Sequence, residues 1–139
     1  MQKKLRAYGA ILAMAFVGLI LWSPGAQSDQ QFTTVTPRQA SALIEMHKGD
    51  PDFVILDIRT PGEYQSGHIE NSIMIDFYSK TFAEEVNRLD KGKTYLVHCR
   101  SGNRSTRAMA LFAKLQFQKI YHLSSGINGW NSEGLPLVK

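Results

Sequence analysis

The sequence has few of the residues that several common kinds of site require. Its 139 residues include a single cysteine, so no disulfide can form within the chain. Most of the net charge of +4 comes from basic residues near the N-terminus, and no basic stripe with interleaved aromatic residues indicates nucleic-acid binding. The histidines show no metal-ligand spacing, which argues against a metal site; they are His47, His68, His98 and His122. The apolar content of 43% suffices for the core of one globular domain.

The N-terminus has the pattern of a secretory signal peptide. Basic residues at the start precede an uninterrupted apolar stretch from Ala7 to Trp22, and the small residues Ala26 and Ser28 suit signal peptidase. The stretch is shorter than the roughly 20 residues of a membrane span. We therefore predict a signal peptide over residues 1–28, export to the periplasm and one domain over residues 29–139. A retained inner-membrane anchor is the alternative, and only then is the membrane a partner.

Short apolar runs alternate with helical patterns along the rest of the chain. Thr36 and Pro37 form a helix start, with Thr as N-cap and Pro at the first helical position. Such alternation predicts an α/β fold with a largely parallel sheet, in which ligands bind beyond the carboxyl ends of the strands. The predicted strands are 32–35, 53–56, 72–75, 95–98 and 120–123. The predicted helical segments are 37–47, 82–89, 105–115 and 127–132, and residues 57–67 are predicted to be a polar connection.

The loop from Cys99 to Ser105 is the main candidate for a site. It joins an apolar strand to a helical pattern, so its N–H groups and the helix N-terminus can form a cradle for an anion. The same field lowers the pKa of a thiol, and the thiolate is the reactive form. An unpaired thiol in an exported protein also indicates a functional role. We therefore predict that Cys99 is a nucleophile that acts on an anionic substrate.

The other loop residues have separate expected roles. Arg104 lies at the junction of loop and helix, where it is expected to orient the anion or to serve a structural role, and Arg100 is expected at the mouth of the pocket. Gly102 is expected to adopt a positive φ, and Ser105 either caps the helix or hydrogen-bonds to the sulfur. The predicted substrate-binding loop comprises Arg100, Ser101, Gly102, Asn103, Arg104 and Ser105.

Three blocks of the sequence, in their order and spacing, resemble the rhodanese family. They are Asp57-Ile58-Arg59 with Glu63-Tyr64 and Gly67-His68-Ile69; Cys99 to Ser105; and Gly126-Ile127-Asn128-Gly129-Trp130 with Leu135-Pro136. The resemblance covers roughly residues 33–138 and implies a rhodanese-like fold, a five-stranded, mainly parallel sheet flanked by helices. It also implies that Cys99 carries a persulfide and that no metal or organic cofactor is required.

By that resemblance the chain is a thiosulfate sulfurtransferase. Cys99 takes the sulfane sulfur from thiosulfate or a similar anionic donor and passes it to a thiophilic acceptor, either cyanide or a thiol such as that of a thioredoxin-like protein. Asp57 and Arg59 match the first block and are expected to brace the active-site loop through charge-assisted hydrogen bonds. His68 is expected to be structural in a Gly-His turn, and His98 to pack behind the loop.

Two other functions are compatible with this sequence. A non-enzymatic rhodanese-like binding module or sulfur carrier would act only with a protein partner. A Cys-dependent phosphatase has a similar strand, loop and helix, but it places one more residue between the Cys and the Arg than the four between Cys99 and Arg104. The smaller ring of N–H groups suits a sulfur atom better than a phosphoryl group.

One segment departs from the family pattern. Many members have two glycines before the Ile-x-x-Trp segment, where this chain has Ser124-Ser125-Gly126. The change is expected to narrow the pocket or to add a hydroxyl to it. Trp130, which closes the segment, is expected to lie in the core rather than to stack on a ligand.

Overall fold

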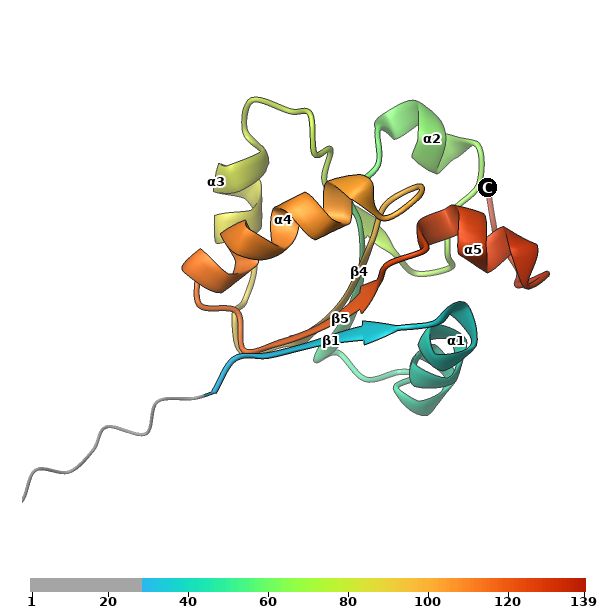
Figure 1. Ribbon diagram of the computed structural model, residues 1–139, viewed down its shortest axis with the longest axis horizontal. Coiled ribbons are helices and arrows are strands. Elements are labelled where there is room, and N and C mark those ends of the chain that lie inside the picture. Colours follow the sequence, from blue (N-terminus) through green and yellow to red (C-terminus); the bar gives the residue numbers. More distant parts are fainter. Residues whose placement is uncertain (1–28) are drawn as a thin grey trace, which may run out of the picture.

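A five-stranded parallel sheet organises residues 29–139, the part of the chain that the computed structural model describes (Figure 1). The strands are β1 (Gln31–Val35), β2 (Phe53–Asp57), β3 (Ile73–Met74), β4 (Thr94–His98) and β5 (Lys119–Leu123). Their spatial order is β1-β5-β4-β2-β3, and every neighbouring pair runs parallel. The predicted α/β fold with a mainly parallel sheet is confirmed.

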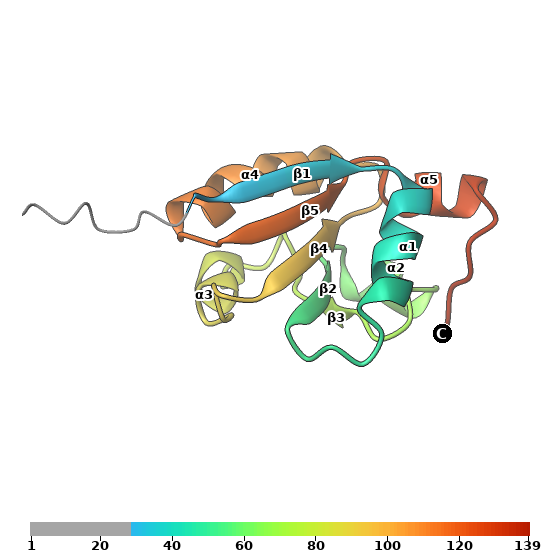
Figure 2. The same cartoon turned by 90° about the horizontal axis from the view of Figure 1, so that it is seen from below.

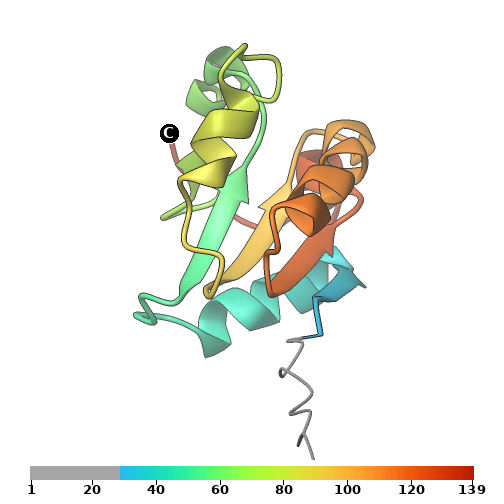
Figure 3. The same cartoon turned by 90° about the vertical axis from the view of Figure 1, so that its left-hand side faces the viewer.

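Helices cover both faces of this sheet. They are α1 (Pro37–Met46), α2 (Pro61–Gln65), α3 (Phe82–Asn87), α4 (Asn103–Lys114) and α5 (Gly126–Ser132). Figures 2 and 3 show α3 and α4 on one side of the sheet and α1 on the other. Within residues 29–139, no helix is long and apolar enough to cross a membrane. The signal peptide or anchor predicted over residues 1–28 lies outside the described part of the chain.

Two hydrophobic clusters, one on each face of the sheet, hold the helices in place. Ile55 and Leu96 belong to the cluster that α1 and α5 cover, whereas Leu56 and Val97 belong to the cluster that α3 and α4 cover. Both faces of β2 and β4 are therefore buried, which explains why these strands read as continuous apolar runs. Trp130 is buried in the first of these clusters and lies in the core, as predicted.

The connection predicted over residues 57–67 contains a short helix, α2, so that prediction is wrong in part. Thr60 is its N-cap, and the side chains of Thr60 and Glu63 satisfy each other's backbone N–H groups in a capping box. Pro61 occupies the first turn, where its missing N–H has no cost. Strand β3 is shorter than the predicted 72–75, because it pairs with β2 at only two positions.

Helix α4 begins at Asn103 rather than at the predicted Ser105. Gly102 is its N-cap residue, with a φ of 95°, and no side chain caps the helix. The prediction of a positive φ at Gly102 is therefore confirmed. Ser105 lies within the first turn of the helix, so the capping role considered for it is wrong, and its hydroxyl is free to point toward the loop.

Candidate active site

Cys99 directly follows β4 and starts the loop that leads into α4 (Figure 1). Cys99 is only 1% exposed. The Gly102 N–H donates a hydrogen bond to Cys99 Sγ over 3.1 Å, and Ser105 Oγ lies 3.4 Å from the same sulfur. The loop therefore wraps around the sulfur, with a backbone N–H from the turn and a hydroxyl from the first turn of α4.

Opposing effects act on the pKa of Cys99. Burial raises it, because a thiolate is poorly solvated inside the protein. Hydrogen bonds from the Ser105 hydroxyl and from the N–H groups of Ser105, Gly102 and Ser101 lower it. Together these bonds outweigh burial, so the pKa of Cys99 lies below its ordinary value. The loop thus favours the thiolate, which is the nucleophilic form.

Close backbone contacts hold the loop in this shape. A Cβ on Gly102 would lie 1.7 Å from the carbonyl oxygen of Ser124, and a Cβ on Gly126 would lie 2.5 Å from the carbonyl oxygen of Cys99. The first turn of α5 also supplies N–H groups to the loop, since the Ile127 N–H donates to the Cys99 carbonyl over 3.0 Å. The segments that follow β4 and β5 are therefore packed backbone to backbone, which fixes the shape of the cradle.

The other loop side chains point in two directions. Arg100, Ser101 and Asn103 are exposed, so Arg100 lies at the surface, where the mouth of the pocket is expected. Arg104 is buried and turns away toward α2. Its Nη1 and Nη2 donate to the two carboxylate oxygens of Glu63, each over 2.7 Å.

This bidentate ion pair joins the loop-to-helix junction to α2. The Arg104 hydrogen bonds hold the pKa of Glu63 at about 2, and the carboxylate in turn raises the pKa of Arg104. Both groups are therefore charged throughout the physiological range. These contacts support the structural role expected for Arg104 rather than the role of orienting an anion. Sequence reasoning matched Glu63 to a family block but did not identify it as the partner of Arg104.

Acid is expected to weaken the Glu63–Arg104 pair. Because the pKa of Glu63 is lowered from 4.5 to about 2 on folding, the stability it contributes is complete above pH 4.5 and is lost as the pH falls toward 2. We expect a contribution of about 1–2 kcal/mol, allowing for the partial exposure of the carboxylate. Chemical denaturation of the wild type and Glu63→Gln across this interval measures it. Parallel stability profiles for the two proteins would contradict the prediction.

Asp57 and Arg59 form a second, fully buried ion pair at the end of β2. Arg59 Nη2 donates to Asp57 Oδ2 over 2.7 Å and to the carbonyl oxygen of Gly67 over 2.8 Å. Asp57 Oδ1 accepts from the Arg59 N–H over 2.9 Å. The expected brace therefore acts mainly on the turn at Gly67, because the two side chains use these hydrogen bonds on each other and on that turn rather than on the loop.

His98 provides an indirect link from this ion pair to the loop. It is fully buried, and its Nδ1 lies 3.3 Å from the carbonyl oxygen of Cys99. Its Nε2 lies 3.8 Å from Asp57 Oδ2 and has no hydrogen-bond partner within the described residues. Burial lowers the pKa of His98 despite the nearby Asp57, so the ring is neutral and packs behind the loop.

Sequence reasoning did not single out His122. The structure places its Nε2 2.8 Å from Ser105 Oγ, the same hydroxyl that contacts the sulfur of Cys99. The available signal was positional: His122 lies next to the end of β5, and β5 neighbours the strand that leads to Cys99. Residue spacing alone could not reveal the contact, because it depends on the strand order.

Ser125, the second serine of the segment that departs from the family pattern, lies against Gly129 of α5. Its Oγ is buried and has no hydrogen-bond partner within residues 29–139. A Cβ on Gly129 would lie 2.1 Å from this oxygen, so the serine occupies space that the absent side chain of Gly129 leaves free. The Ser125 hydroxyl therefore packs against α5, whereas Ser124 is exposed. The expected narrowing of the pocket or added hydroxyl stays a prediction.

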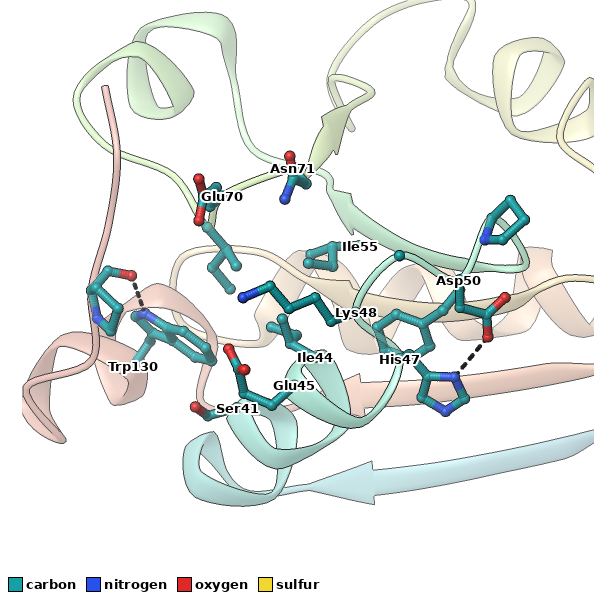
Figure 4. A pocket seen from close by; sticks show the side chains of 15 residues that line it. Ser41, Ile44, Glu45, His47, Lys48, Asp50, Ile55, Glu70, Asn71 and Trp130 are labelled. Carbon is teal, nitrogen blue, oxygen red and sulfur yellow. Dashed lines mark hydrogen bonds and ion pairs between the residues drawn. The ribbon is translucent and has the colours of Figure 1, made fainter.

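A cavity of about 470 Å³ lies elsewhere on the domain (Figure 4). Its lining includes Ile44, His47, Ile55, Glu70 and Trp130, and none of residues 99–105. We place the candidate site at Cys99 all the same, because the hydrogen bonds to the sulfur and the lowered thiol pKa occur there. Within residues 29–139, no group of three His, Cys, Asp or Glu side chains is arranged to hold a metal ion.

Comparisons with known proteins identify the family to which the chain belongs. Residues 37–133 match the rhodanese-like domain. A sulfurtransferase of Allochromatium vinosum is 30% identical over 87 residues, which are 63% of this chain and 79% of that protein. A tRNA uridine(34) hydroxylase of Buchnera aphidicola subsp. Schizaphis graminum is 32% identical over 108 residues, 70% of this chain but only 34% of the hydroxylase. The crystal structure of a rhodanese-related protein from Thermoplasma volcanium has a TM-score of 0.64 at 29% identity, over 76% of this chain and 97% of that one.

Proposed function

This chain belongs to the rhodanese-like domain family, and from that premise we propose that it is a sulfurtransferase that carries sulfane sulfur as a persulfide on Cys99. We propose thiosulfate as the donor and a thiophile, either cyanide or a thiol, as the acceptor. The observation that supports this most directly is the sulfur of the single cysteine, enclosed by the Gly102 N–H and the Ser105 hydroxyl. A thiolate stabilised in this way is the nucleophile that sulfur transfer requires.

In the first half of the proposed reaction, the Cys99 thiolate attacks the outer sulfur of thiosulfate. A bond forms between Cys99 Sγ and that sulfur, while the bond between the two thiosulfate sulfurs breaks and sulfite leaves with the electron pair. The negative charge moves from Sγ to the terminal sulfur of the persulfide, so the cradle of N–H groups holds a charge throughout. Arg100, an exposed residue of the loop, provides positive charge where the dianion approaches.

In the second half, the acceptor attacks the terminal sulfur of the persulfide. The bond between this sulfur and Sγ breaks, and Cys99 leaves as a thiolate. A stabilised thiolate is a good leaving group as well as a good nucleophile, so one environment serves both halves of the cycle. No oxidant or reductant is consumed, and the two half-reactions predict ping-pong kinetics.

Mass spectrometry of the intact protein tests the proposal. After incubation with thiosulfate and removal of excess donor, we expect Cys99 to gain the mass of one sulfur atom, because a persulfide is a stable but reversible modification of a thiolate. Addition of cyanide should remove that mass and release thiocyanate in equal amount. Because Cys99 is the only cysteine, the modified position is unambiguous.

The result also separates the proposal from a binding module. A protein that gains no sulfur from thiosulfate or any other sulfane donor would contradict the sulfurtransferase function and favour a module that acts only with a protein partner. A protein that gains the sulfur but does not yield it to cyanide or small thiols would favour a sulfur carrier with a dedicated acceptor.

A further inference from the structure

His122 is a buried titratable group that the proposed reaction does not yet use. It lies on β5 and is 7% exposed. Its Nε2 lies 2.8 Å from Ser105 Oγ, and Ser105 Oγ lies 3.4 Å from Cys99 Sγ. A chain of three side chains thus leads from the sulfur, through a hydroxyl, to an imidazole ring.

The hydrogen-bond capacity of Ser105 decides which of these side chains donates and which accepts. Ser105 Oγ has only one hydrogen, and besides the sulfur and His122 it lies 3.2 Å from the carbonyl oxygen of Gly102. A thiolate and a carbonyl oxygen can only accept, so the Ser105 hydrogen must serve these two groups. The lone pairs of Ser105 Oγ are then free to accept, and His122 Nε2, when it carries the ring hydrogen, is within donating distance.

The surroundings of His122 favour a neutral ring. Its neighbours in register are Thr34 on β1 and Val97 on β4, neither of which carries a charge, and α4 covers it with Ser105. Cys99 is the titratable group that Ser105 links to it within the described part of the chain. Burial lowers the pKa of His122. A neutral imidazole with its hydrogen on Nε2 donates to Ser105 without placing an unpaired charge inside the domain.

We propose that His122 is a positioning residue for sulfur transfer: its Nε2–H donates to Ser105 Oγ and thereby directs the Ser105 hydrogen toward the Cys99 thiolate. The inference rests on the proposed function of Cys99 as the sulfur carrier. If Nε2 accepted instead, the Ser105 hydrogen would turn to the ring and the thiolate would lose its hydroxyl donor. The linked hydrogen bonds also polarise one another, which strengthens the bond to the sulfur.

The test is a pH titration of Cys99. The ultraviolet absorbance of the thiolate monitors the titration, and Cys99→Ser serves as the blank. His122→Phe keeps a ring but loses the donor, and we expect the apparent pKa of Cys99 to rise by about one unit. At pH values well below the wild-type pKa of Cys99, the rate constant for persulfide formation should fall about tenfold, with little change in KM for thiosulfate. His122→Asn, whose shorter amide does not reach Ser105, should behave in the same way. His122→Gln, whose amide can still donate, should titrate close to the wild type.

Two controls make the result specific. His68→Phe removes a histidine that stacks on Tyr64, with ring centroids 3.8 Å apart, and should leave the titration of Cys99 unchanged. In a Ser105→Ala background, His122→Phe should have no further effect, because the hydroxyl that connects the two groups is absent.

An unchanged Cys99 titration in folded His122→Phe and His122→Asn overturns the inference, as does an additive effect of His122→Phe in the Ser105→Ala background. A lower melting temperature without a shifted thiol titration would show a purely structural role and would overturn it too. If the wild type forms no persulfide, the proposed function fails, whereas the titration still decides whether His122 acts on Cys99.

Discussion

Replacing Cys99 with serine is expected to reduce sulfur transfer from thiosulfate by roughly 10³-fold or more. The loop lowers the pKa of the Cys99 thiol, whereas the pKa of a serine hydroxyl lies so far above neutral pH that the same hydrogen bonds cannot ionise it. A hydroxyl is also much less nucleophilic toward sulfur. The measurement is steady-state formation of thiocyanate from thiosulfate and cyanide, with the uncatalysed reaction subtracted.

The Cys99→Ser variant should fold normally, because the serine fits the same space and can accept the hydrogen bond of the Gly102 N–H. Unfolding at the wild-type denaturant concentration would show this, so a loss of activity would report on chemistry alone. Substantial remaining turnover would contradict the role of Cys99. Robust hydrolysis of para-nitrophenyl phosphate that depends on Cys99 would contradict the choice of sulfur over phosphoryl chemistry.

The Gly102→Ala substitution should have the largest effect on stability. A Cβ at this position would lie 1.7 Å from the carbonyl oxygen of Ser124, which belongs to the backbone and cannot swing aside. The φ of 95° is also unfavourable for any residue with a side chain. We expect the free energy of unfolding to fall by at least about 3 kcal/mol. Sulfur transfer should be lost as well, because the Gly102 N–H can no longer reach the sulfur.

Gly62→Ala is the matched control for this prediction. A Cβ on Gly62 meets no atom within 4 Å, and Gly62 lies in helix α2, where alanine is preferred to glycine. This variant should be as stable as the wild type or slightly more so. Urea denaturation of both variants, together with the thiocyanate assay, checks the pair. Equal denaturation midpoints for Gly102→Ala and Gly62→Ala would show that the close contact with the Ser124 carbonyl does not destabilise the Gly102→Ala variant.

Much of the fold could be predicted because its signals are local. The capping box at Thr36 and the following proline mark the start of α1. The continuous apolar runs identify strands that are buried on both faces, and their alternation with helices indicates a parallel sheet. The start of α2 carried a local signal too, since Thr60 and Glu63 form the same kind of capping box, but the segment is so short that its polar composition dominated the prediction.

The partners of the site residues could not be predicted in the same way. Arg104 and Glu63 are 41 residues apart in sequence, and Ser105 and His122 are 17 apart. Each contact exists only because β4 lies between β2 and β5 in the sheet, which brings the segments after these strands together. Nothing in the spacing of either pair encodes that order.

The sequence by itself determined the candidate nucleophile, the loop around it and the type of fold. These depend on residues close together in the chain: a strand, a cysteine, a glycine with positive φ and a helix. Only the tertiary structure decided that Arg104 is bound to Glu63, that Asp57 and Arg59 hold the Gly67 turn, and that Ser105 contacts His122. The physical reason is that a side chain's hydrogen bonds are directional and short-ranged, so they depend on which strands become neighbours when the sheet assembles.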